Sequence, residues 1–298
     1  MSKKKVKQKH KVEKLGKSND LITYCIHAFP ILGSKSACKK AIKSDRLLLN
    51  GALAKSYDKI KVGDVLTLIG SKIHQAKKLD MELELVFEDD HIVVVNKPGG
   101  IAVNGNRFKT LENALVGHHS NLKDSLPRPI AVHRIDVPTT GLVLFAKTKS
   151  ALIILGKAFQ EKKVQKEYHA IVHGNPSEKG KIDKDIQSKM AITKYEKLQT
   201  VNSKFYQHLS LLRLIPITGR THQLRIHLQS EGHLIVGDKQ YAAAQKTILG
   251  KGLMLCSTRL KFKHPLNNKD MDIKIKMPRK FMRILDRETK ISKFKRRR

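Results

Sequence analysis

The sequence is poor in cysteine, in aromatic residues and in long apolar runs. Its three cysteines, Cys25, Cys38 and Cys256, are too few and too scattered to form a disulfide framework or a zinc site. No apolar run approaches the roughly 18 residues needed to span a bilayer, and the first residues lack the apolar core of a secretory signal. These absences argue against a disulfide-rich secreted protein and a helical membrane protein, and we expect a reducing, cytoplasmic location without a membrane partner.

Acidic residues are scarce as well. The 298 residues include 60 lysines and arginines but only 26 aspartates and glutamates, which gives a formal net charge of +34. Residues 1–18 hold eight lysines and residues 288–298 hold six basic residues, so most of the excess lies between these ends. A body that is so basic predicts a polyanionic partner, with nucleic acid ahead of a membrane surface. The alternative is a lysine-rich surface that is merely solvated.

Residues 19–70 carry the signals of a small helix–helix–hairpin domain. Polar residues at 19–20 and at 34–36 can each cap a helix, and Asn50-Gly51 between two apolar runs is typical of a tight hairpin. The second helix carries lysines on its outward positions, which can contact RNA phosphates. These predicted RNA contacts are Lys39, Lys40 and Lys43.

This order of elements resembles the small RNA-binding module first seen in a ribosomal small-subunit protein (S-four-like). The resemblance rests on the lysine-rich helix, the Leu-Asn-Gly hairpin and the Val62-Gly63-Asp64 ending. An arginine is often found early in the second helix of such modules, and this chain has Ser34, Lys35 and Ser36 there. The alternative is an unrelated α+β subdomain with a solvated basic face.

Beyond residue 80, apolar runs that predict strands outnumber helical patterns. There is no regular alternation of strand and helix and no internal repeat, which favours an α+β body with a mixed, mostly antiparallel central sheet. Thr110 and Ser150 are the predicted caps of two of its helices. The predicted organisation is a basic disordered tail (1–18), the small domain (19–70), a linker (71–80), a catalytic domain (81–287) and a basic C-terminal tail (288–298).

The stretch 133–147 is the centre of the functional argument. His133, Arg134 and Asp136 precede a Pro-Thr-Thr-Gly breaker cluster, and an apolar run follows. This order predicts a loop that presents Asp136 and is anchored by a buried strand. A carboxylate next to Arg134 can be either a reactive group or half of a structural ion pair, and the local pattern leaves both open.

Asp136, Tyr168 on a predicted strand, and Arg220 and Arg225 around a predicted helix start could meet in the fold. A carboxylate that faces an arginine stays ionised, because the cation favours the charged form. A tyrosine can stack on a base and hydrogen-bond through its hydroxyl. In a basic protein, this combination suggests nucleophilic or acid–base chemistry on a nucleobase.

Five motifs, in this order along the chain, resemble those of the RluA-type RNA pseudouridine synthases. They are Asn96-Lys97-Pro98-x-Gly100, the stretch 133–147 (His-Arg-Ile-Asp-x-x-Thr-Thr-Gly-Leu-Val-Leu-Phe-Ala-Lys), Lys166-Glu167-Tyr168, the run 218–225 (Thr-Gly-Arg-Thr-His-Gln-Leu-Arg) and Gly237-Asp238-x-x-Tyr241. Two departures, Ile135 for the usual leucine and Thr140 for the usual serine, preserve size class or hydroxyl.

The resemblance implies the pseudouridine synthase sheet and the conversion of uridine in RNA to pseudouridine, without a metal or an organic cofactor. It implies that Asp136 is the nucleophile, either by attacking the sugar or by steering an elimination. Tyr168 would stack on the base and assist removal of the carbon 5 proton, and Arg225 would pair with Asp136. The implied RNA contacts are Arg134, which takes the place of the flipped uridine in the RNA stack, Lys166 and Arg220. Large-subunit ribosomal RNA is the favoured target, with transfer RNA as the other candidate.

Other interpretations of these residues remain open. The chain could be a non-catalytic RNA-binding assembly factor on the same fold, or a hydrolase that uses a second carboxylate, for which Asp238 is the weak candidate. Tyr168 could be a simple core residue. We expect His133 to support the loop, whereas the sequence leaves Lys97 and His222 undecided between packing, loop support and phosphate contact.

Overall fold

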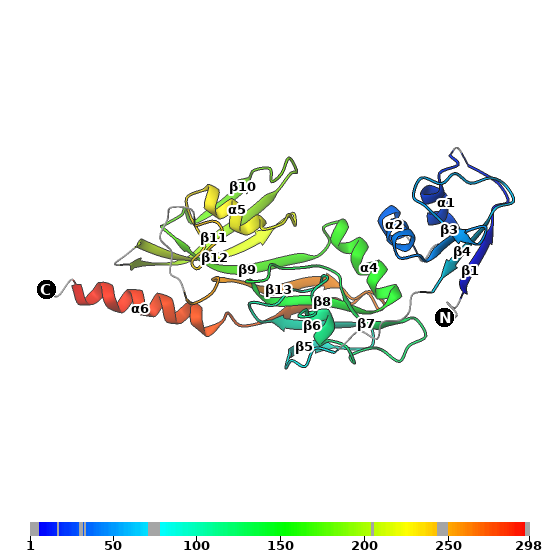
Figure 1. The fold of residues 1–298 in the computed structure, drawn as a ribbon. Helices are drawn as coiled ribbons and strands as arrows, with labels where there is room; N and C mark the ends of the chain where they lie inside the picture. Colours follow the sequence, from blue (N-terminus) through cyan, green and yellow to red (C-terminus); the bar gives the residue numbers. More distant parts are fainter. Residues whose placement is uncertain are drawn as a thin grey trace. The chain divides into compact units, whose positions relative to one another are not determined.

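The computed structural model describes residues 6–295 except 17, 30, 31, 33, 71–77, 204–205 and 243–249. The chain forms two compact units, Met1–Ala76 and Lys77–Arg298 (Figure 1). Each unit has hydrophobic clusters of its own. Most of the predicted linker, 71–77 of 71–80, lies outside the described residues.

The N-terminal unit is an antiparallel sheet with two helices. Asp20 caps the first helix by accepting a hydrogen bond from the Thr23 N–H (2.9 Å), and Ser34 caps the second through the Ala37 N–H (3.2 Å). Both lie at the predicted capping positions. The sheet order is β1-β4-β2-β3. The bounds are β1 Val6–Lys11, α1 Leu21–Ala28, α2 Lys35–Lys43, β2 Leu47–Leu49, β3 Ala52–Leu53 and β4 Val65–Ile69.

The predicted hairpin is confirmed. Asn50 and Gly51 have φ of 50° and 85°, the left-handed conformations that a tight hairpin turn requires and that Asn and Gly accept at low cost. The Asn50 side chain also accepts a hydrogen bond from the Val65 N–H at 2.8 Å and donates to Asp64 at 2.9 Å. The turn is therefore fastened to β4 as well as closed on itself.

The prediction of a disordered tail over 1–18 is wrong for part of its length. Residues 6–11 form β1, which pairs antiparallel with β4. Val12, directly after β1, is fully buried, and His10 hydrogen-bonds the Tyr24 hydroxyl at 3.0 Å. The lysine-rich composition concealed a strand because backbone hydrogen bonds, rather than an apolar face, hold β1 in the sheet.

The C-terminal unit is built on a ten-stranded sheet in the order β10-β11-β12-β9-β13-β8-β6-β5, with β14 beside β13 and β7 beside β8. The β8–β13 pair is parallel and the other pairs of this sheet are antiparallel, which confirms the predicted mixed, mostly antiparallel sheet. The strands are β5 Glu84–Glu88, β6 Ile92–Lys97, β7 Ser125–Ala131, β8 Thr140–Thr148, β9 Gln165–His173, β10 Lys179–Asp183, β11 Ile192–Ser203, β12 Gln207–Pro216, β13 Leu255–Lys263 and β14 Asp270–Lys274.

Gly141 allows β8 and β13 to meet. A Cβ at this position would lie 2.1 Å from the Ser257 carbonyl oxygen, and its φ is +105°, so no other residue fits without displacing backbone. The register joins Cys256 with Thr140 and Ser257 with Gly141. This short parallel pair connects the β9–β13 side of the sheet with the β8–β6 side.

The described residues of the unit also form four helices: α3 Leu111–Ala114, α4 Lys149–Gln160, α5 Gln223–Ser230 and α6 Arg279–Lys295. Figure 1 shows α4 over β8 and α5 over β11 and β12. Thr110 caps α3 as predicted. The predicted cap of α4 is wrong, because Thr148 accepts from the Ala151 N–H, while Ser150 donates its hydroxyl proton to Asp124 at 2.6 Å.

The predicted basic tail over 288–298 is also wrong as far as residue 295, because α6 continues to Lys295. Phe281, Ile284 and Leu285 are buried at helical spacing. Glu288, one turn further on, is 1 % exposed and accepts a hydrogen bond from the Ser203 hydroxyl at 2.8 Å. None of the helices in the described ranges combines the length and apolarity that a membrane crossing requires.

Candidate active site

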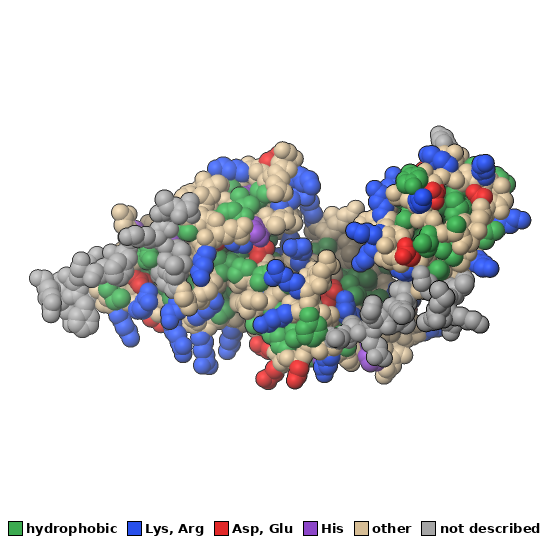
Figure 2. Space-filling view, in the orientation of Figure 1, with side chains coloured by type: hydrophobic (Ala, Val, Ile, Leu, Met, Phe, Trp, Pro, Cys, Tyr) green, Lys and Arg blue, Asp and Glu red, His purple; other side chains and the backbone are tan. Residues whose placement is uncertain are grey.

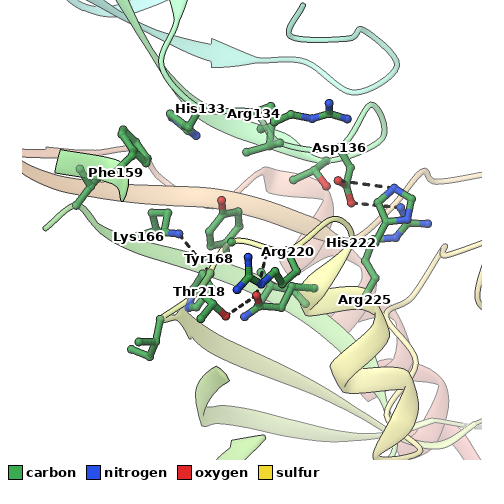
Figure 3. A pocket seen from close by; sticks show the side chains of 18 of the residues that line it. His133, Arg134, Asp136, Phe159, Lys166, Tyr168, Thr218, Arg220, His222 and Arg225 are labelled. Carbon is green, nitrogen blue, oxygen red and sulfur yellow. Dashed lines mark hydrogen bonds and ion pairs between the residues drawn. The ribbon is translucent and has the colours of Figure 1, made fainter. Parts of the chain in front are cut away.

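A cavity of about 570 Å³ opens where the 133–139 loop, the start of β9 and the start of α5 come together (Figure 3). Its lining includes six of the residues singled out in the sequence: Arg134, Asp136, Lys166, Tyr168, Arg220 and Arg225. The structure thus brings together side chains up to 91 positions apart in the chain. Lys39, Lys40 and Lys43 are exposed on α2 of the other unit and are not among the lining residues.

A buried lysine, Lys97, holds the Asp136 loop in place. Lys97 is fully buried and its Nζ donates to the carbonyl oxygens of Pro98 (2.8 Å), Ile101 (2.9 Å) and Val137 (2.9 Å). Thr139 N–H closes a turn onto the Asp136 carbonyl at 3.1 Å. Lys97 therefore supports the loop, which resolves the three uses that the sequence left open for it.

Burial lowers the pKa of Lys97 to about 8, although the nearby Asp136 carboxylate opposes the shift. Below that pH the side chain is an ammonium with three N–H donors, which matches the three carbonyl oxygens around it. The loop that presents Asp136 is thus fixed by a charged group without contact to solvent.

Arg225 links Asp136 to a second carboxylate. Its Nη1 donates to Asp136 at 3.2 Å. Its Nε and Nη2 donate to the two carboxylate oxygens of Asp238 at 2.7 and 2.8 Å, which is a bidentate contact. Burial alone would lower the pKa of Arg225, but Asp238 and then Asp136 outweigh this and raise it. Asp238 also accepts from the backbone N–H groups of Gln240 and Tyr241, so it orients the arginine that orients Asp136.

His222 and Tyr241 close the same group of side chains. The His222 ring lies 3.9 Å from Asp136 Oδ1, measured from Nε2, while its Nδ1 is 2.8 Å from the Tyr241 hydroxyl. The Arg225 guanidinium lies 4.9 Å from the centroid of the Tyr241 ring, within cation–π range. His222 therefore packs beside the carboxylate and is positioned by Tyr241.

Tyr168 occupies the cavity wall with its hydroxyl directed into the open space (Figure 3). The residue is 8 % exposed. Burial raises the pKa of Tyr168 to about 12; Ser257 on the paired strand opposes this shift, and Asp136 adds to it. Tyr168 therefore keeps its proton at neutral pH and offers a neutral ring to a bound base.

His133 supports the loop, as expected. Its Nε2 accepts a hydrogen bond from the Leu144 N–H at 3.0 Å, and its ring stacks on Phe159 with centroids 4.8 Å apart. Burial, and to a smaller degree Lys166, lowers the pKa of His133 to about 3. The neutral ring can therefore remain an acceptor for the strand β8 that follows the loop.

The 218–223 loop is closed by Gln223. Its Oε1 accepts from the Thr218 hydroxyl (2.7 Å) and from the Arg220 N–H (3.0 Å). Lys166 Nζ donates to the Thr218 carbonyl at 3.4 Å, and burial lowers the pKa of Lys166. Arg220, on the exposed rim, donates through Nε to the Met190 carbonyl, and Arg134 is also exposed at the rim. The rim is therefore positive while the floor carries Asp136.

Two residues have positioning roles in the site that the sequence did not predict, although Asp238 was the weak candidate for a second carboxylate. Asp238 and Gln223 lie inside motifs, but each is positioned by contacts with other elements: Asp238 by Arg225 on α5, and Gln223 by Ile192 and Thr193 on β11. The only signal available was their place in the motifs. In the ranges that the structure describes, no group of His, Cys, Asp or Glu could hold a metal ion.

Comparisons with known proteins point to one family. Residues 91–230 match the family model described as RNA pseudouridylate synthase. The "Ribosomal large subunit pseudouridine synthase D" of Zymomonas mobilis is 35% identical over 67% of this chain and 70% of its own length, and that of Vibrio cholerae is 32% identical over 82% and 84%.

Among solved structures, "Human RNA Pseudouridylate Synthase Domain Containing 4" aligns with a TM-score of 0.56 and 25% identity. The alignment covers 68% of this chain and 92% of the human one. The sheet, the sequence motifs and the relatives agree, and the chain belongs to the RluA-type family of RNA pseudouridine synthases.

Proposed function

We propose that this protein converts uridine in large-subunit ribosomal RNA to pseudouridine, with Asp136 acting on a uridine flipped out of the RNA. The observation that carries the proposal is the placing of Asp136 against Arg225 in one cavity with the ring of Tyr168. The target follows the names of the relatives from Zymomonas mobilis and Vibrio cholerae. We expect the reaction to take place in the cytoplasm.

The reaction is an isomerisation and needs no co-reactant. The bond from uracil N1 to C1′ of the ribose breaks, the base turns, and a bond from C5 to C1′ forms. The proton on C5 is lost to water and N1 gains one, so no atoms are added or removed. Asp136 assists the first step from its place 3.2 Å from Arg225, which holds and orients the carboxylate.

Tyr168 offers a surface on which the base can turn. Because its pKa is about 12, the phenol is neutral at pH 7, and we assign its main contribution to stacking. It can accept the C5 proton only while passing its own proton on. Arg134 is exposed on the rim and fills the space that the flipped uridine leaves in the RNA, which offsets part of the unstacking cost of a few kcal/mol.

The positive surface holds the RNA backbone. Lys166 and Arg220 line the cavity, and Lys and Arg side chains are scattered over the visible surface of both units, with fewer acidic side chains among them (Figure 2). The N-terminal unit adds further phosphate contacts, and its sheet and helices are consistent with an S-four-like module. The lysines that we assign to this contact are Lys39, Lys40 and Lys43.

The test is release of tritium from ribosomal RNA labelled at uracil C5. We expect the wild-type protein to release tritium and leave the RNA chain and its bases intact, and Asp136→Asn to release none. Asp183→Asn is the matched control, because Asp183 lies on β10 outside the cavity and pairs with Lys181 at 2.6 Å. Release by Asp136→Asn at the wild-type rate would refute the assigned role.

The same assay separates the alternatives. A hydrolase would leave abasic RNA, but Asp238 is 1 % exposed and bound to Arg225, so it is not available to activate water. A binding-only protein would release no tritium from any cellular RNA. Mapping pseudouridines in ribosomal and transfer RNA from cells with and without the protein identifies the target.

A further inference from the structure

The segment 53–62 of the N-terminal unit exposes apolar side chains that a small domain normally buries. The exposed fraction is 71% for Tyr57, 62% for Val62 and 53% for Leu53. A single exposed leucine is ordinary, whereas three large exposed apolar side chains within ten residues call for an explanation. Tyr57 is the most exposed of them and has the only ring.

The backbone under Tyr57 is held in a closed turn. Asp58 N–H donates to the Lys55 carbonyl at 3.1 Å, and Lys55 N–H donates to the Asp58 carboxylate at 2.6 Å. The start of α1 fastens the turn through the Leu21 N–H and the Asp58 carbonyl at 3.4 Å, and Asp20 bridges to Lys59. The ring is therefore presented by an ordered turn, so little ordering entropy remains to be lost on binding.

Three lysines lie within four residues of Tyr57 in the chain. Lys55, Lys59 and Lys61 are exposed, and Lys55 Nζ lies 5.7 Å from the centroid of the Tyr57 ring. The nearby carboxylates already have partners: Asp58 accepts from Lys55 N–H, and Asp64 accepts from Lys61 N–H at 2.7 Å. Among the described residues, none of the three lysines is in an ion pair within 4.0 Å.

We propose that Tyr57 is a stacking platform for an unpaired base of the RNA, with Lys55, Lys59 and Lys61 on the phosphates beside it. An exposed ring between cations fits single-stranded nucleic acid, because stacking is available to every base and the lysines follow the backbone. The proposal rests on the proposed function only in that the partner is RNA. It assigns the N-terminal unit a base contact in addition to the phosphate contacts of α2.

The absence of tryptophan from the chain provides a direct probe. In the full-length Tyr57→Trp variant the new indole is the only one, so its fluorescence reports on this position alone. We expect a 12-nucleotide oligouridylate to quench it and inorganic polyphosphate of equal charge to leave it unchanged, even though polyphosphate competes for the lysines. Equal responses to the two polyanions would mean charge contact without stacking.

Substitutions at Tyr57 measure the contribution of the ring to affinity. We expect Tyr57→Ala and Tyr57→Leu to bind the oligouridylate about 10-fold more weakly, and Tyr57→Phe to bind within about 2-fold of wild type, because the ring alone stacks. Unchanged circular dichroism checks the fold. The proposal is overturned if Tyr57→Ala binds the oligouridylate with wild-type affinity. It is also overturned if Tyr57 is needed to bind a protein partner that does not displace RNA.

The wild-type tritium assay separates this result from the proposed function. If tritium is released and Tyr57→Ala binds normally, only the stacking platform is wrong. If the ring stacks on RNA but no tritium is released, the proposed function is wrong.

Discussion

Single residues at the site differ sharply in how far they could be predicted. Asp136, Tyr168 and Arg225 carry reactive or aromatic groups inside recognisable motifs, and the structure places all three in one cavity. In the sequence, Asp238 was only a weak candidate for the second carboxylate of a hydrolase. In the structure it forms the bidentate contact that fixes Arg225. Which of two aspartates faces a cavity depends on the folding of distant loops, and spacing along the chain does not contain that information.

Lys97 shows the same limit for a cation. A lysine after an apolar strand is normally an exposed strand end, yet this one is fully buried and binds three carbonyl oxygens. Its pKa of about 8 lies below the usual value of 10.5. The folded protein therefore releases this proton between these pH values, where the unfolded chain still binds it.

As the pH rises through the pKa of Lys97, we expect the activity to fall and the free energy of unfolding to rise. Above about pH 8 the neutral amine has only two N–H donors for three carbonyls, so the Asp136 loop loosens and kcat falls. Over the same range this group makes the free energy of unfolding rise, because the unfolded state binds more protons. Tritium-release rates and urea unfolding between pH 7 and 10 measure both.

Lys97→Met is the control for that coupling. The methionine fills the space without a titrating group. The activity of the variant should therefore be low, and its pH profile should lack the alkaline limb, which is the loss of activity above about pH 8 that Lys97 causes. Loss of the three hydrogen bonds should cost roughly 3 kcal/mol of unfolding free energy at pH 7. An unchanged alkaline limb in Lys97→Met would show that another group is responsible.

At the scale of elements, strands and helices with a clear apolar period were predictable and others were not. The buried strands β6 and β8 and the hairpin at Asn50-Gly51 were found because composition and turn residues agree. β1 was missed because a lysine-rich strand is held by its backbone. α6 was missed because its apolar residues lie among basic ones, and only the 281, 284, 285 spacing reveals the helix.

The contact between β8 and β13 gives a sharp prediction. Gly141→Ala should prevent folding or lower the free energy of unfolding by more than about 3 kcal/mol, because its Cβ would meet the Ser257 carbonyl at 2.1 Å in a left-handed conformation. Urea unfolding and the yield of soluble protein measure the effect. Activity should fall with stability, since the two sides of the cavity meet at this pair.

Gly156→Ala is the matched control. Gly156 lies within α4, and an added Cβ there meets nothing within 4 Å. Alanine in a helix interior is favoured over glycine by up to about 1 kcal/mol. The control should therefore be as stable as wild type or more so, and a loss equal to that of Gly141→Ala would show that the close contact is not the cause.

At the scale of the whole molecule, the two units have separate cores. The cluster of the N-terminal unit runs from Val12 to Leu68, and the clusters of the C-terminal unit contain none of its residues. The charge excess of the sequence predicted an RNA partner for the whole chain. Neither charge nor composition could assign separate tasks to the units, because lysines are spread over both.

The fragment 78–298 is expected to fold alone and to keep the chemical step. Its thermal midpoint should lie within about 5 °C of the corresponding transition in the full chain. Its kcat for tritium release should stay within about 3-fold of that of the full chain, while its KM rises at least about 10-fold. This pattern is expected when the lost contacts bind the substrate and the transition state equally. A fragment that folds but loses kcat would show that the N-terminal unit also positions the uridine.

The place of β13 in the sheet has a consequence for biosynthesis. Residues 255–263 insert between β9 and β8, two strands made about a hundred residues earlier. While the chain is being translated, these strands cannot pair through β13, and the cavity between their two sides stays unfinished. A nascent chain therefore completes the cavity only after residue 263 has left the ribosome. Until then, the edge of β9 and the part of β8 that β7 does not cover are open, and chaperones can protect them.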